Sequence, residues 1–289
     1  MPVVVPTSLA DAVAAAAAAP EALFLAGGTD LMVEVNERHR TLPWGDTSVI
    51  SLGRVPELTS WTLDPETRRL RLGAGIRWAE IERDPLQSMV PALAEAARTV
   101  GSPQIRNAGT IGGNLATCSP AGDGLPVLVA LDAEIHLVAS GGRRSMPVAE
   151  FMLGVKRTAL EPGELIEAIT VPVLDGWQGY SKVGVRNAMV IATASACVAT
   201  DTPGRTVRIA LGSVGPTIVR CHDAEQVVGE AVDWAGGTID VAAADEAGRL
   251  AAAASRPIDD HRSTADYRRH AVGVMVRRLV RRAFPGGAA

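Results

Sequence analysis

Two glycine turns hold the residue types in this sequence that could do chemistry. The first reads "AGGTD", Ala26 to Asp30, and the second reads "TIGGN", Thr110 to Asn114. Glycine has no Cβ, so it accepts positive φ and lets a ligand come close to the backbone. Consecutive N–H groups in such a turn can form an anion-binding concavity, and a helix that starts after the turn adds its dipole. Two such turns, each leaving a strand, could therefore hold a pyrophosphate between them.

Polar side chains near the two turns suit the same ligand. Thr29, Thr110 and Asn114 would add donors, and Asp123 is an acceptor for sugar hydroxyls. The alternative is that both turns only reverse the chain, which is the usual role of a Gly-Gly pair. The residues alone leave these two interpretations open.

Other motifs point away from chemistry carried by this chain alone. "GAGIRW", which starts at Gly73, has Trp78 where a dinucleotide fingerprint needs Gly or Ala, so we expect a strand end there. Cys118 has no histidine nearby in sequence to activate it and is expected to fill space. We expect no catalytic residue and no metal ligand in this chain. Any reactivity must then come from a cofactor.

Composition limits the class of protein. The length of 289 residues favours two domains, and the net charge of −4 argues against nucleic acid as a partner. The three cysteines are scattered, without a C-x-x-C pair, so neither a disulfide framework nor a metal cluster is expected. The N-terminus lacks the basic start of a signal peptide, and no run of ~18 apolar residues exists. We expect a cytoplasmic protein without a membrane span.

Periodicity indicates the elements that must position the two turns. A helix up to Ala19 precedes a short apolar strand that leads into Gly27, and a further helix starts near Leu31. Strand patterns follow at 67–76, 133–151 and 163–172. A boundary is expected within "LDGWQG", 174–179. Beyond it the pattern predicts three strands and then helices.

The two turns together closely resemble those of the FAD-binding medium subunits of molybdenum hydroxylases, the xanthine dehydrogenase and carbon monoxide dehydrogenase group. The match continues through "EPGELIEAITVP", "YSKVGVR" and "PIDDHRSTADYRRHAVGVMVRR" and covers essentially the whole chain. It implies an α+β fold: a vanillyl-alcohol-oxidase (PCMH)-type FAD-binding domain at 1–175, with α+β subdomains at about 1–55 and 56–175. A carbon monoxide dehydrogenase flavoprotein C-terminal-like domain follows at 176–289, with a three-stranded antiparallel sheet and a helical bundle.

The resemblance also implies which residues hold FAD. The two loops would bind the pyrophosphate and Asp123 the sugar region, while Val100, Ile166 and Lys182 would lie near the flavin ring. The cofactor-binding positions so implied are Phe24, Leu25, Ala26, Gly27, Gly28, Thr29, Asp30, Leu31, Val100, Thr110, Ile111, Gly112, Gly113, Asn114, Asp123, Ile166 and Lys182.

The implied function is electron transfer inside a heteromeric enzyme. A large subunit with a molybdenum cofactor would oxidise the substrate. A small subunit with two [2Fe–2S] clusters would pass electrons to the FAD of this chain, which would deliver them to an external acceptor. A dimer of such heterotrimers is expected.

The substrate class and the function itself keep alternatives. "AGGTD", where carbon monoxide dehydrogenases often have "AGGHS", favours a purine, xanthine or N-heterocycle dehydrogenase. A carbon monoxide dehydrogenase is the alternative. A non-redox nucleotide-binding module and a self-contained flavin oxidase remain further alternatives.

Overall fold

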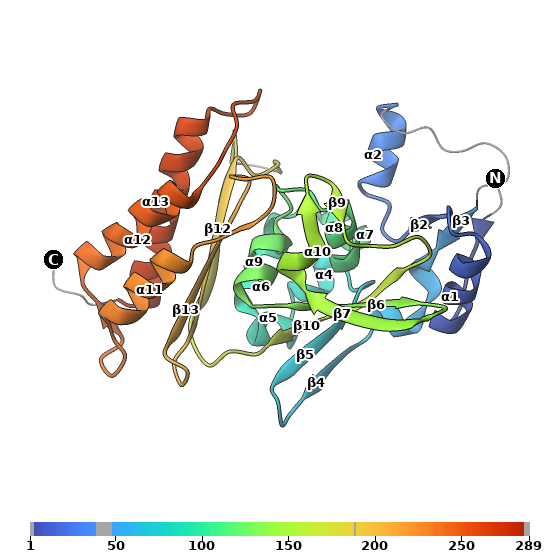
Figure 1. Ribbon diagram of the computed structural model, residues 1–289, viewed down its shortest axis with the longest axis horizontal. Helices are drawn as coiled ribbons and strands as arrows, with labels where there is room; N and C mark the ends of the chain where they lie inside the picture. Colours follow the sequence, from blue (N-terminus) through green and yellow to red (C-terminus); the bar gives the residue numbers. More distant parts are fainter. Residues whose placement is uncertain (1–2, 39–47, 188, 286–289) are drawn as a thin grey trace.

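A computed structural model describes residues 3–38, 48–187 and 189–285. It confirms an α+β fold in which two regions of the chain share one sheet as their boundary (Figure 1). The N-terminal region lies at the blue to green end of the view, and the C-terminal helices lie at the opposite, red end.

The first subdomain is a small parallel sheet with one covering helix. Its strands are β1 (Val3–Val4), β3 (Val49–Ser51) and β2 (Leu23–Leu25), in that order across the sheet. Helix α1 (Leu9–Ala18) begins where the Ser8 side chain accepts a hydrogen bond from Asp11 N, and α2 (Leu31–Asn36) follows the first glycine loop. A compact core of Ala16, Ala22 and Ile50 holds this layer together.

The second subdomain is a five-stranded antiparallel sheet with helices on one face. Its order is β4 (Trp61–Asp64), β5 (Arg69–Gly73), β10 (Leu165–Pro172), β6 (Glu134–Ala139) and β7 (Gly142–Pro147). Alternation puts Leu70, Leu72 and Ile135 in the core and Arg69, Arg71 and His136 on the open face. The remaining elements are η1 (Leu52–Arg54), α3 (Pro56–Thr59), α4 (Trp78–Ile81), α5 (Leu86–Met89), α6 (Pro91–Thr99), α7 (Pro103–Ala108), α8 (Ile111–Thr117), α9 (Gly124–Ala130), α10 (Val148–Phe151), β8 (Met152–Gly154) and β9 (Arg157–Thr158).

The main sheet of the C-terminal region has one strand more than the sequence predicts. The three predicted strands are β11 (Gln178–Val183), β12 (Ala194–Asp201) and β13 (Thr206–Gly212), and the two-residue β14 (Val219–Arg220) adds a fourth at the edge. A strand of two residues is too short to show a period in the sequence, which is why the prediction stopped at three. The other elements are α11 (His222–Ala231), β15 (Val232–Asp233), β16 (Thr238–Ile239), α12 (Val241–Ala254) and α13 (Ala265–Ala283).

This C-terminal sheet is buried on both faces. Cys197 and Ala199 of β12 belong to the core of the N-terminal region, whereas Ala196 and Val198 face the core under α12 and α13. The small side chains let helices approach the sheet closely on each side (Figure 1). None of the described helices is long and apolar enough to cross a membrane.

Candidate functional site

The first glycine loop offers a row of backbone donors. Strand β2 ends at Leu25, and Gly28 then adopts φ +69°, in the left-handed region that favours glycine. Within the described part of the chain, the N–H groups from Ala26 to Leu31 donate to no other residue. A left-handed residue inside such a row turns successive N–H groups toward one side, which is the geometry of an anion nest.

The second loop differs from the prediction. It does not leave a strand: α7 precedes it, and its glycines lie in the first turn of α8. Thr110 is the N-cap, with its Oγ1 accepting from Gly113 N at 3.0 Å, and Gly112 N donates to the Ala74 carbonyl at 2.8 Å. The N–H groups of Ile111 and Asn114 donate to the Ile76 and Thr110 carbonyls. Because these N–H groups already have partners, the second loop gives few free donors, and neither of its glycines has positive φ. The loop mainly fixes the position of α8.

The two loops meet directly. A Cβ on Gly27 would overlap the Ala108 carbonyl oxygen, so glycine is needed for the first loop to reach the residues just before the second. The Thr117 hydroxyl, at the end of α8, donates to Asp30 Oδ2 at 2.7 Å. The free donors of the first loop therefore lie beside α8, as a site between the two loops requires.

The "GAGIRW" segment supports the second loop. β5 ends at Gly73, as predicted, and a Cβ on Gly112 would lie 2.6 Å from the Ala74 Cβ. Trp78 is buried, and its ring packs where a Cβ atom of Gly124 would be. The segment thus forms the surface against which the second loop and α8 pack.

A buried polar cluster lies next to the second loop. Lys182 Nζ donates to Asp123 Oδ2 at 2.8 Å and to the Thr99 carbonyl at 3.0 Å, and the Tyr180 hydroxyl donates to Asp123 Oδ1 at 2.8 Å. The side chains of Lys182 and Asp123 are only 8% and 10% exposed. Burial raises the pKa of the Asp123 carboxyl, and the Lys182 ammonium and the Tyr180 hydroxyl act against that rise.

The structure therefore joins two residues that the sequence analysis placed at different ends of FAD. Asp123 was expected at the sugar region and Lys182 near the ring, yet the two side chains form one ion pair across the domain boundary. Tyr180 was missed. Alternation along a strand puts it on the same side as Lys182, so the "YSK" spacing was the signal that could have found it.

The remaining predicted residues lie on other elements. Val100 follows Thr99 at the end of α6, and its carbonyl accepts from Arg106 Nη1 at 3.3 Å. Ile166 lies in β10, 8% exposed, next to Glu167, whose carbonyl accepts from Ala74 N. Phe24 is partly buried in β2 and Leu25 Cδ1 lies under Gly28.

The residues present fit a dinucleotide. The first loop supplies unpaired N–H groups for a pyrophosphate, and Asn114 Oδ1 is buried without a hydrogen-bond partner among the described residues. A buried orphan acceptor is costly unless a ligand or water pairs with it. Among the described residues, no group of His, Cys, Asp and Glu could hold a metal ion.

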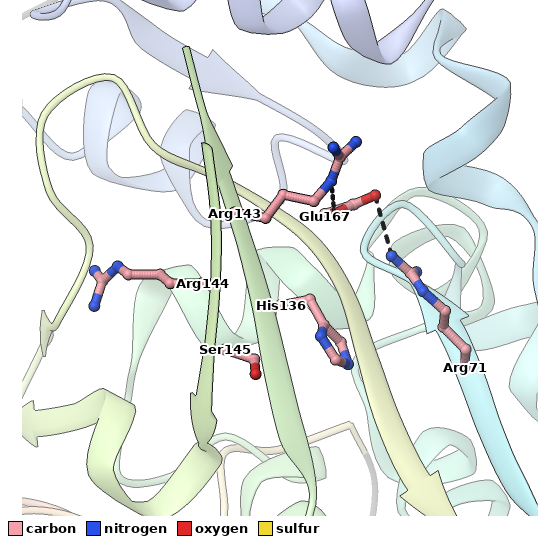
Figure 2. A pocket seen from close by; sticks show the side chains of 6 residues that line it. All are labelled: Arg71, His136, Arg143, Arg144, Ser145 and Glu167. Carbon is pink, nitrogen blue, oxygen red and sulfur yellow. Dashed lines mark hydrogen bonds and ion pairs between the residues drawn. The ribbon is translucent and has the colours of Figure 1, made fainter. Parts of the chain in front are cut away.

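A separate hollow of about 260 Å³ lies on the open face of the five-stranded sheet, and Figure 2 shows the side chains that line it. Its Glu167 pairs with Arg71 and Arg143, each at 3.1 Å, while Arg144 points away from His136. His136 Nε2 lies 2.6 Å from Thr170 Oγ1. These charges satisfy one another and include no predicted FAD residue, so we regard the hollow as a polar sheet surface.

Comparison with known proteins identifies the family of the chain. Residues 1–174 match the family described as the FAD binding domain in molybdopterin dehydrogenase, and residues 180–283 match the CO dehydrogenase flavoprotein C-terminal domain. The chain is 33% identical over 272 residues to the carbon monoxide dehydrogenase medium chain of Hydrogenophaga pseudoflava, covering 91% of this chain and 90% of that one.

Two further relatives extend this comparison. The xanthine dehydrogenase FAD-binding subunit of Escherichia coli O157:H7 is 31% identical over 229 residues, which is 76% of each chain. The structure of reconstituted CO dehydrogenase from Oligotropha carboxidovorans superposes with a TM-score of 0.87 at 32% identity, covering 98% of this chain and 97% of that one. The chain therefore belongs to the FAD-binding flavoprotein subunits of the molybdenum hydroxylases, the xanthine and carbon monoxide dehydrogenase family.

Proposed function

We propose that this chain holds one FAD, without a covalent link, between its two glycine loops. The observation that carries the proposal is the row of unpaired N–H groups from Ala26 to Leu31, facing no partner in the described chain and lying against α8. Phosphate oxygens are the acceptors that such a row of N–H groups binds. The orphan Asn114 Oδ1 supports the same site, because a flavin or ribose donor would pair with it.

The proposed roles differ in the part of FAD that each group of residues contacts. Phe24 to Leu31 bind the pyrophosphate. Thr110 to Asn114 support it, with Asn114 contributing its side chain. Asp123 and Lys182 lie where the two domains meet, with Lys182 near the flavin ring, and Val100 and Ile166 offer apolar contacts for the ring. Loop and cluster are linked, since Asn114 Oδ1 lies close to Gly124, the neighbour of Asp123.

The cofactor supplies the redox chemistry, and the chain supplies binding and charge. When bound, FAD exchanges electrons between [2Fe–2S] clusters in a small partner subunit and an external acceptor. A large partner with a molybdenum cofactor oxidises the substrate. The printed names of the relatives, "medium chain" and "FAD-binding subunit", support a heteromeric complex of this kind, with a dimer of heterotrimers as the expected assembly.

The substrate class is proposed from the first loop. "AGGTD" favours a purine, xanthine or N-heterocycle dehydrogenase over a carbon monoxide dehydrogenase. Identities of 31% to the xanthine and 33% to the carbon monoxide relative do not separate the two. The substrate pocket itself would lie in the large subunit.

The domain division and the compartment are also proposals. A boundary at 175/176 is supported by family matches that end at 174 and resume at 180. The separate small core around Ile50 supports subdomains at about 1–55 and 56–175. A cytoplasmic location is supported by three buried free cysteines, which suit a reducing compartment.

The test is purification of the tagged chain from its native host. We expect a molybdenum-containing large subunit and an iron–sulfur small subunit to copurify, with FAD, molybdenum and iron measured in the complex. Recovery of the chain alone, without flavin or metals, would contradict the proposal. A flavin-free chain would point instead to a non-redox nucleotide-binding module.

A further inference from the structure

The Tyr180–Asp123–Lys182 cluster joins three segments of the chain at the domain boundary. Asp123 precedes α9 in the FAD-binding region, whereas Tyr180 and Lys182 belong to β11 of the C-terminal sheet. The Thr99 carbonyl at the end of α6 accepts from Lys182 Nζ at 3.0 Å. α6 also supplies Glu95 Oε2, which accepts from Tyr180 N at 2.7 Å.

The two oxygens of Asp123 have different donors. Lys182 Nζ donates to Oδ2 and the Tyr180 hydroxyl donates to Oδ1, both at 2.8 Å. Tyr180 is 6% exposed, and burial is the main reason that its pKa lies well above the usual value, so it stays a neutral donor. The phenol thus fixes the rotation of the carboxylate and keeps Oδ2 on the ammonium.

The charge that this cluster presents to its surroundings depends on that arrangement. An ammonium and a carboxylate in contact nearly cancel at a distance, and in a buried setting a small change in their geometry alters the potential nearby more than it would in water. A hydrogen bond to the carboxylate offsets part of its negative charge. Removing the donor therefore makes the cluster more negative, and removing the carboxylate makes it more positive.

We propose that Tyr180 is a positioning residue that holds Asp123 against Lys182 and thereby sets the electrostatic potential at the flavin. The inference rests on the proposed function, in which Lys182 lies near the flavin ring. It assigns to the C-terminal domain a role in tuning the reduction potential of FAD. The rival explanation is that the cluster only fastens the two domains together.

The test measures the midpoint potential of FAD bound to the full-length chain. The variants are Y180F, D123N and K182M. The control is S181A, whose side chain points to the opposite face of β11 because side chains alternate along a strand. We expect D123N to raise the potential, because it leaves the Lys182 ammonium uncompensated. Y180F and K182M should lower it, and S181A should leave it unchanged.

The expected size for Y180F is a two- to tenfold change in the equilibrium constant for reduction, up to about 30 mV for a two-electron couple. Phenylalanine keeps the packing, so FAD occupancy should stay close to that of the wild type. If the cluster only fastened the two domains together, the FAD potential should not shift in opposite directions in D123N and Y180F.

Three results would overturn the inference, and they differ in what else they overturn. An unchanged potential in Y180F, with K182M shifted, removes Tyr180 alone. Shifts of the same sign in Y180F and D123N identify a fastening role only. A wild-type chain that binds no FAD removes the proposed function, and with it the inference.

Discussion

At the scale of single residues, the glycines of the two loops have different physical roles. Gly28 is needed for its backbone conformation, Gly27 for the close approach of the loops, and Gly112 for contact with Ala74. Only Gly28 both has positive φ and belongs to the row of free N–H groups. It is therefore the glycine whose replacement should affect the ligand most directly.

Gly28→Ala should weaken FAD binding about five- to thirtyfold, because a Cβ opposes the left-handed conformation that orients the N–H groups. The conformational cost is about 1–2 kcal/mol. Gly237→Ala is the matched control: Gly237 has φ +65°, and a Cβ there would meet nothing within 4 Å. Titration of the flavin-free proteins with FAD should show a loss of affinity in the first variant only. Equal affinities would exclude the first loop as the phosphate site.

Arg268→Met should destabilise the C-terminal domain by about 3 kcal/mol, because it leaves buried acceptors unpaired. Arg268 is 4% exposed and donates to the Thr193 and Ser213 carbonyls and to Asp260 Oδ1. The neighbouring Arg269 pairs with Asp266 on the surface, with 46% of its side chain exposed. Arg269→Met should change stability by less than about 1 kcal/mol. Denaturant unfolding of both variants would check the difference, and equal losses would show that the buried contacts are not what matters.

At the scale of elements, the contacts that hold the start of α8 decide the position of the second loop. Helix α8 is anchored by the N–H of Gly112 on the Ala74 carbonyl and by the Thr110 cap. Both contacts are made inside the protein, so this helix supports the site through its position more than through its own donors.

Gly112→Ala should lower stability by about 1–3 kcal/mol and reduce FAD content together, since the new Cβ would lie 2.6 Å from the Ala74 Cβ and push α8 outward. Gly229→Ala in α11 is the control: a Cβ there meets nothing within 4 Å, and alanine should raise stability by about 0.5–1 kcal/mol. Thermal unfolding and flavin absorbance of the purified proteins measure both effects. Normal FAD content in a destabilised Gly112→Ala protein would show that α8 does not form part of the site.

At the scale of the whole molecule, the C-terminal sheet is part of two cores. One face packs on α6 and α9 of the FAD-binding region, and the other lies under α12 and α13. The salt bridges of Arg208 and Arg220 with Asp132 add further links across the boundary. The two domains are therefore packed together around the Asp123–Lys182 pair.

The purified chain should release its FAD on acid precipitation, because neither glycine loop contains a histidine for a covalent link and the Cys118 thiol, beside the second loop, is buried and donates to the Gly154 carbonyl at 3.6 Å. Flavin in the supernatant, measured by absorbance and fluorescence, is the expected result, and flavin in the pellet would contradict it. The same chain, purified without partners, should oxidise no organic substrate.

The sequence by itself determined the main strands and the family. Alternation located β5, β6, β7 and β10, and the glycine loops and "YSKVGVR" identified the flavoprotein subunits. These features are local, because each depends on residues a few positions apart. Tertiary structure alone decided which backbone N–H groups stay free, that Gly112 faces Ala74, and that Asp123 pairs with Lys182 through the help of Tyr180. Those contacts join positions far apart in the chain, and no spacing within one segment records them.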